Sequence, residues 1–159
     1  MIKNVKWIFV VLIISSLISF SFVGKNTLTE GLTIGDKAPT FTICGEKQLI
    51  DLKDLRGKYV LLSFWASYDA LSRMQNATLN HAVAQADNVE MVSVSFDEYK
   101  SIFNETIKKD QISTSNCFVE LAGVSSDLYQ TYRLKRGFKN FLLDENGAVS
   151  YTHLRAHET

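Results

Sequence analysis

Cysteine, proline and histidine are all scarce in this chain of 159 residues. The two cysteines, Cys44 and Cys117, are too few for a disulfide-stapled scaffold, and they do not form a Cys-x-x-Cys pair. Two of the three histidines, His153 and His157, stand close to the C-terminus. A zinc site needs several Cys or His ligands at close spacing, so the sequence predicts no metal site.

An excess of charge of either sign is also lacking, because 17 basic residues balance 17 acidic ones. No basic stripe with interleaved aromatic residues is present, which argues against nucleic-acid binding. The sequence has no internal repeat and no glycine-rich phosphate loop, and we expect no cofactor. The stretch between the N-terminal and C-terminal segments, roughly residues 25–148, is long enough for one domain with its own hydrophobic core.

The N-terminus has the pattern of a targeting segment. Residues 1–6 contain two lysines and no acid, and residues 7–23 are apolar apart from four serines. A basic region followed by an apolar run is typical of a secretory signal, although the run is short for a spanning helix of about 20 residues. We predict that residues 1–23 are a signal peptide or an N-terminal membrane anchor. The protein is then exported, and is either periplasmic or tethered through residues 7–23 facing the periplasm.

We predict that the C-terminal residues 149–159 are not part of the natural protein. Their back-translation resembles a transposon-type sequencing-library adapter, and processing scars are left out of fold reasoning. We therefore interpret residues 149–159 as an adapter-derived tail, so His153 and His157 carry no functional meaning. We also expect the natural domain to continue beyond Ala148, so that the sequence is truncated on its C-terminal side.

The middle of the sequence alternates between strand-like and helix-like segments. Residues 24–36 are polar and read as a linker, and the apolar run Tyr59–Trp65 fits a strand buried on both faces. Such alternation predicts β-α-β units around a central sheet. The expected strands lie at 38–43, 59–65, 89–96 and 140–144, and the expected helices at 69–86, 97–110 and 125–132.

Several short motifs, in order and at the right spacings, connect this pattern to a known family. They are Gly35-Asp36-x-Ala38-Pro39-x-Phe41, Gly57-Lys58, Phe64-Trp65-Ala66 and Phe141-Leu142-Leu143-Asp144-x-x-Gly147. From about residue 35 to residue 148 the sequence resembles the extracytoplasmic thiol–disulfide oxidoreductases of the thioredoxin superfamily, the TlpA/ResA group related to AhpC/TSA. The resemblance implies an α/β thioredoxin fold over residues 37–148, with a central mixed sheet flanked by helices.

The sequence departs from this family at the two catalytic cysteines. Where the family has Phe-Trp-Ala-x-Trp-Cys-x-x-Cys-Arg, this protein has Asp69 at the first cysteine and Ser72 at the second. Thiol–disulfide exchange requires a thiolate nucleophile, which neither side chain supplies. We expect the inherited site to be redox-inactive, with Asp69 as a helix N-cap. A general-base role for Asp69 is the alternative, whereas a hydrolytic Ser72–His81 pair is disfavoured by about 13 Å of helix between them.

Two further departures adjoin this site. The family has a cis-proline before the strand that contains Phe141, and here the alignment puts Phe138 at the proline and Lys139 at the next position. We expect a trans peptide bond and a groove partly filled by the Phe138 ring. Ser63 stands where classical thioredoxins have a buried Asp that serves proton transfer.

These departures favour a binding or accessory module over an enzyme. The predicted binding face comprises Trp65, Tyr68, Asp69, Phe138 and Lys139. Its partner is expected to be an extracytoplasmic protein or peptide, and the nearby cluster Arg133, Lys135, Arg136 and Lys139 suits an acidic one. The alternative is a thiol–disulfide oxidoreductase or antioxidant enzyme that uses Cys44 and Cys117. These two cysteines either form a disulfide, which export would permit, or are separate buried thiols.

Overall fold

The computed structural model describes residues 29–45, 49–113 and 115–152. The predicted signal peptide or anchor, residues 1–23, lies outside these ranges. Among the described residues, no helix has both the length and the apolar character needed to cross a bilayer.

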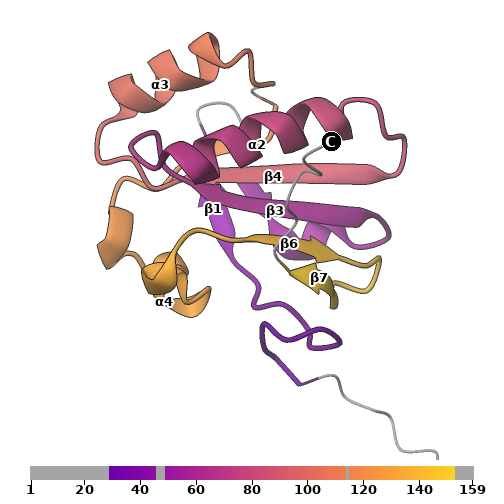
Figure 1. The fold of residues 1–159 in the computed structure, drawn as a ribbon. Coiled ribbons are helices and arrows are strands. Elements are labelled where there is room, and N and C mark those ends of the chain that lie inside the picture. The colour runs from indigo at the N-terminus through magenta and orange to yellow at the C-terminus, as the bar shows by residue number, and fades with distance from the viewer. Residues whose placement is uncertain (1–28, 46–48, 114, 153–159) are drawn as a thin grey trace, which may run out of the picture.

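A five-stranded mixed sheet forms the centre of the domain, as the resemblance implied (Figure 1). Its strands are β3 (Tyr59–Trp65), β4 (Val89–Ser95), β5 (Cys117–Val119), β6 (Asn140–Leu143) and β7 (Val149–Thr152), in the order β5-β4-β3-β6-β7. Strand β4 runs parallel to both β3 and β5, whereas β6 is antiparallel to β3 and to β7. The parallel pairs require crossover connections, and helices supply them.

The helices lie on both sides of this sheet. They are α2 (Ala70–Val83), α3 (Lys100–Lys109) and the short α4 (Asp127–Thr131), with 3₁₀ turns η1 (Leu52–Leu55), η2 (Gly123–Ser125) and η3 (Leu134–Arg136). A separate two-stranded antiparallel hairpin pairs β1 (Thr42–Cys44) with β2 (Leu49–Asp51). Helices α2 and α3 lie above the sheet in Figure 1, and α4 lies below it.

The main core lies on the α4 side of the sheet and is rich in aromatic rings. Phe64 of β3 contacts Phe96, Tyr132 and Phe141, with ring centroids 4.6 to 6.2 Å apart. The Tyr132 hydroxyl donates a 2.6 Å hydrogen bond to the carbonyl of Pro39, and burial raises the pKa of Tyr132. This bond ties the segment after α4 to the residues that enter β1. Burying each such ring contributes about 1.5–3 kcal/mol to folding.

Residues on both sides of the predicted domain, 37–148, pair with each other and belong to the folded unit. Val149 is only 1% exposed, its N–H donates to the Asp36 carbonyl at 2.8 Å, and its own carbonyl accepts from Gly35 at 2.8 Å. The sheet therefore runs to Thr152 and binds part of the segment predicted as a linker. The reason is the turn at 144–148, after which β7 returns along β6. The adapter origin of residues 149–159 stays a prediction, and residues 153–159 lie outside the described ranges.

Candidate functional site

Asp69 caps the N-terminus of α2 at the end of the loop that follows β3. Its carboxylate accepts a 2.7 Å hydrogen bond from the backbone N–H of Ser72, and its carbonyl accepts the N–H of Arg73 at 3.0 Å. Its backbone is extended, with φ −97° and ψ 99°, as N-cap residues usually are. The carboxylate thus satisfies an N–H group at the positive end of the helix dipole, where the family pattern has its first cysteine.

Ser72 is held inside the first turn of α2. The residue is 5% exposed, and its hydroxyl donates to the Asp69 carbonyl at 3.2 Å and accepts the N–H of Ala66 at 3.4 Å. His81 lies in the last turn of the same helix, where it is exposed. The Ser72 hydroxyl is therefore engaged with backbone groups and is not activated by His81.

Asp97 is a buried carboxylate directly beside this loop. It is 2% exposed, and its two oxygens accept the Ser67 N–H at 3.0 Å, the Ser67 hydroxyl at 2.6 Å and the Ser95 hydroxyl at 2.6 Å. The sequence pattern placed Asp97 at the start of the second helix, but α3 begins only at Lys100, with Tyr99 as its N-cap. Asp97 instead turns inward and holds the loop before α2. The one signal in the sequence was the Ser95-x-Asp97 spacing at the end of β4.

An exposed aromatic surface adjoins Asp69. Tyr68 is 67% exposed, and its ring lies 6.3 Å from that of Phe138. Phe138 in turn stacks on Phe96 at 5.9 Å and meets Tyr129 edge-on at 6.3 Å. The Phe138 ring thus packs against its aromatic neighbours at the former cis-proline position, and the described residues contain no cis peptide bond.

Burial and nearby acids act together on the Tyr68 hydroxyl. Partial burial is the main cause that raises the pKa of Tyr68, and the charges of Tyr129, Asp97, Asp69 and Glu98 raise it further. Tyr68 therefore stays a neutral phenol that can donate a hydrogen bond at physiological pH.

Tyr68, Asp69 and Phe138 form one surface, which we call the aromatic face after its two rings.

Two members of the predicted binding face lie differently from the others. Trp65 is 0% exposed, its indole N–H donates to the Ser93 hydroxyl at 2.9 Å, and its ring packs against Phe103. The prediction of Trp65 as a surface residue was therefore wrong, because its side chain points into the core under α3. Lys139 is half-buried, and its carbonyl accepts the Phe64 N–H at 3.2 Å, which anchors the segment that holds Phe138.

The two cysteines are free thiols in different surroundings. Cys44 is exposed at the end of β1, whereas Cys117 lies on β5 and its thiol donates to the Ser93 hydroxyl at 3.5 Å. Burial raises the pKa of Cys117 to about 11. No disulfide joins them in this structure. Within the described ranges, no group of three or more Cys, His, Asp or Glu side chains could hold a metal ion.

Ser63, at the position of the buried thioredoxin acid, is also inside the protein. It is 0% exposed, and its hydroxyl has no hydrogen-bond partner among the described residues. It pairs in register with Ser93 of β4 and Asn140 of β6, so a row of short polar side chains crosses the sheet. None of them is an acid, and this row offers no carboxyl group for proton transfer.

A surface groove of about 630 Å³ lies along α2. It is lined by Tyr68, Met74, His81 and the ion pair between Arg73 and Asp110, among others. Arg73 donates two hydrogen bonds of 2.6 Å to Asp110, which lowers the pKa of that carboxyl. This bidentate pair joins α2 to the residue that follows α3.

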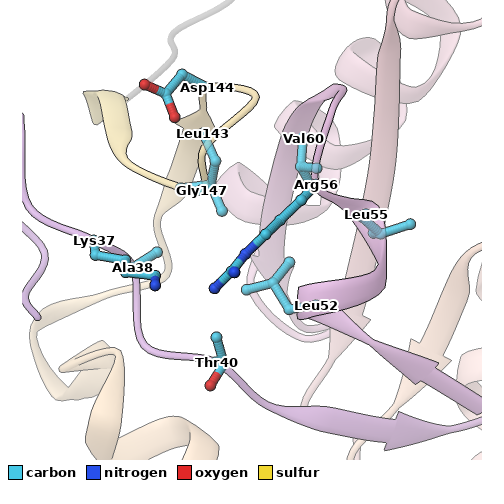
Figure 2. Close-up of a pocket in the computed structure, with 10 residues that line it drawn as sticks. All are labelled: Lys37, Ala38, Thr40, Leu52, Leu55, Arg56, Val60, Leu143, Asp144 and Gly147. Carbon is cyan, nitrogen blue, oxygen red and sulfur yellow. The ribbon is translucent and has the colours of Figure 1, made fainter.

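A second cavity, near the start of β3, is too small for a ligand. Its volume is about 10 Å³, which is about one water molecule. In Figure 2 the Arg56 side chain points into the space between Ala38, Leu52 and Leu143. This region packs the β6–β7 turn against η1 and offers no binding site.

Comparison with known proteins agrees with this architecture. The profile of the AhpC/TSA family matches residues 34–152. A thiol-disulfide oxidoreductase ResA from Bacillus anthracis is 30% identical over 150 residues, which cover 89% of this chain and 82% of that protein. The crystal structure of a thioredoxin-like protein from Parabacteroides distasonis superposes with a TM-score of 0.69 at 40% identity, covering 80% of this chain and 92% of that one. A structure described as a thiol:disulfide interchange protein DsbE from Chlorobium tepidum has a TM-score of 0.65 at 25% identity, with 80% and 89% covered. The chain therefore belongs to the AhpC/TSA family, as a TlpA/ResA-like member of the thioredoxin superfamily.

Proposed function

We propose that this protein is a binding or accessory member of its family, redox-inactive at the inherited site, that uses the aromatic face to hold a protein or peptide. The relatives are named as thiol–disulfide oxidoreductases, and this protein has their fold. What distinguishes it is the chemistry at positions 69 and 72. A carboxylate and a hydroxyl cannot replace a thiolate in attack on a disulfide sulfur.

The observation that carries this proposal is the hydrogen bonding of those two residues. Asp69 uses its carboxylate to cap the N–H of Ser72, and the Ser72 hydroxyl bonds within the same turn. Both side chains therefore stabilise the first turn of α2 through these hydrogen bonds. This arrangement keeps the family scaffold stable without any thiol at its active-site position.

The aromatic face has the features of a recognition surface. Tyr68 exposes most of a large ring whose position is supported by Phe138, and tyrosines are enriched at binding hot spots. Arg133, Lys135 and Arg136, which precede Phe138, are all exposed. An extended peptide with an apolar side chain against Tyr68 and an acidic residue toward these basic groups fits this surface.

Residues 1–23 bear on where this binding occurs. We propose that the protein is exported and acts in the periplasm, either free or tethered through residues 7–23. The support is the basic and then apolar N-terminal pattern. A reporter enzyme that is active only outside the cytoplasm, fused after residue 23, tests the export. A reporter that stays inactive would contradict it.

The redox part of the proposal is tested by disulfide reduction of insulin. The wild type is compared with the double variant Asp69→Cys/Ser72→Cys, which restores the two thiol positions on the same scaffold. We expect an inactive wild type and an active double variant. Turnover by the wild type would overturn the proposal.

The binding part is tested with an array of acidic and basic extracytoplasmic peptides. We expect Tyr68→Ala to abolish capture of the peptides that the wild type binds. Tyr59→Ala is the matched control, since Tyr59 is partly exposed at the opposite end of β3. Equal loss in both variants would argue against the aromatic face.

A thiol–disulfide oxidoreductase or antioxidant enzyme that uses Cys44 and Cys117 is the second candidate. It is favoured by one observation, namely that both cysteines line the same cavity beside β5. The raised pKa of Cys117 opposes it, because a protonated thiol is a weak nucleophile. Loss of a measured activity in Cys44→Ser or Cys117→Ser would support this candidate, and unchanged behaviour would exclude it.

A further inference from the structure

The face of α2 that points away from the sheet has no lysine, arginine or acidic residue. Helix α2 packs against β3 and β4 (Figure 1), and Ser72 and Asn76 are buried on that side. The residues of the opposite face are exposed or half-buried, and we call them the outer α2 face: Ala70, Leu71, Met74, Ala77, Thr78 and His81. A surface helix usually presents charged residues to solvent, as α3 does with Glu105, Lys108 and Lys109. A face that lacks them is typical of a surface covered by another chain.

Large and small side chains occupy different halves of this face. Leu71 and Met74, in the N-terminal half, are 61% and 58% exposed. Ala77 and Thr78, in the C-terminal half, are small and line the groove of about 630 Å³ that runs along α2. One half of the face therefore projects from the helix, and the other half is hollowed.

The spacing of the face suits packing against a second helix. Leu71, Met74, Thr78 and His81 follow one another at intervals of three, four and three residues, as the seam positions of paired helices do. The Thr78 hydroxyl already donates a 2.9 Å hydrogen bond to the Met74 carbonyl. Covering Thr78 would therefore leave no hydroxyl without a partner.

We propose that the outer α2 face pairs with the same face of a second copy of this chain. The two α2 helices run antiparallel about a twofold axis near Met74, so that Leu71 of each copy lies opposite Ala77 and Thr78 of the other. The projecting half of each face then fills the hollowed half of its mate. The balance of 17 basic and 17 acidic residues means that no net charge drives the copies apart.

The size of the interface sets its strength. Helix α2 has 14 residues, so the pair buries a small surface and forms a weak, reversible dimer. This inference does not rest on the proposed function, because no residue of the outer α2 face belongs to the aromatic face.

Sedimentation velocity of the whole chain over a wide concentration range tests the dimer. We expect the sedimentation coefficient to rise with concentration, and Leu71→Glu to weaken the association at least about tenfold, because it places a carboxylate against an apolar surface. The matched control is Ile102→Glu, at an apolar residue of α3 that is 44% exposed, and it should leave the association unchanged.

Three results would overturn the proposal. They are a monomer at every concentration, an equal loss in the Ile102→Glu control, and an association that Leu71→Glu does not weaken. The last of these is the result expected if the chains associate through the apolar residues 7–23.

A charge-pair variant tests the antiparallel arrangement. Thr78→Lys alone should weaken the dimer as Leu71→Glu does, whereas Leu71→Glu/Thr78→Lys places each glutamate opposite the lysine of the other copy. The double variant should associate at least about fivefold more tightly than either single variant. Both positions are exposed, and glutamate and lysine are good helix formers, so α2 is kept. A double variant no tighter than Leu71→Glu would contradict the arrangement.

Cross-linking at the twofold axis gives a second readout. Met74→Cys, in a Cys44→Ser background that removes the exposed native thiol, should form a covalent dimer under mild oxidation. The matched control is Ser101→Cys in the same background, at an exposed position of α3, and it should remain monomeric. Equal cross-linking of the two variants, or none in Met74→Cys, would contradict a twofold axis near Met74.

Discussion

The Asp69 carboxylate accepts a 2.7 Å hydrogen bond from the backbone N–H of Ser72. The two residues at the family's thiol positions are therefore hydrogen-bonded to each other, with Asp69 as the N-cap of α2 and the Ser72 N–H as the donor. In the family pattern these two positions hold the cysteines of the Cys-x-x-Cys motif. Here the same spacing of three residues meets the geometric requirement of an N-cap.

Removing the Asp69 cap should destabilise the fold modestly. Asp69→Ala is expected to lower the free energy of unfolding by about 1 kcal/mol, because the N–H of Ser72 loses its acceptor. Asp69→Asn is the matched control and should cost much less, since asparagine also caps helices. Urea denaturation followed by far-UV circular dichroism measures both. An Asn variant as unstable as the Ala variant would contradict a capping role.

Asp97→Ala should lower the free energy of unfolding more than Asp69→Ala does. In Asp97→Ala, the Ser67 N–H and the hydroxyls of Ser67 and Ser95 lose a buried acceptor. We expect a loss of about 3 kcal/mol, as for a buried hydrogen-bonded charge. Asp87→Ala, at an exposed turn, should stay within about 0.5 kcal/mol of the wild type. If the two variants unfold at the same urea concentration, Asp97 does not hold the loop before α2.

The Arg73–Asp110 pair should make stability depend on acid pH. The hydrogen bonds from Arg73 lower the pKa of Asp110 below 3.8, so the folded state binds the proton more weakly than the unfolded state. This contribution is fully present above the unfolded pKa and is lost as the pH falls through the lower folded pKa. Asp110→Asn should therefore be less stable than the wild type near neutral pH.

The comparison at low pH checks this interpretation. The stability difference between the wild type and Asp110→Asn should begin to shrink below about pH 4 and should be smallest at the most acidic pH that still permits folding. Thermal denaturation from acid to neutral pH measures it. A difference that is constant over this range would mean that the Asp110 carboxylate has the same pKa in the folded and unfolded states.

The two thiols should react at very different rates. With a pKa of about 11, Cys117 is a thiolate in only about one molecule in 10⁴ at neutral pH. Cys44 is exposed, so the native protein should take up one equivalent of iodoacetamide quickly and the second only after unfolding. Mass spectrometry of Cys44→Ser and Cys117→Ser identifies the modified residue. Rapid native labelling of the Cys44→Ser variant would show that Cys117 is accessible.

Much of the central layer could be predicted from local pattern. The apolar run that forms β3 and the alternation that forms β4 were both recognisable, because strand periodicity and β-branched residues act over a few neighbouring positions. The N-cap at Asp69 was also predicted, because the family resemblance places a helix N-terminus at this position and aspartate is a favourable N-cap residue. The start of α3 was placed three residues too early, at Asp97, because an acid after a strand resembles an N-cap.

The sequence by itself determined the strand and helix pattern, the fold that the motifs imply and the absence of thiols at positions 69 and 72, since these depend on residue type and local spacing. Only the tertiary structure decided which way side chains point and which distant groups meet. It buried Trp65 against Ser93, although the apolar run could not show which of its residues reach the surface. It also joined Asp97 to Ser67, 30 residues away, and brought Val149 into the sheet. Those contacts depend on strand register and on helix packing across the sheet, which no short stretch of sequence contains.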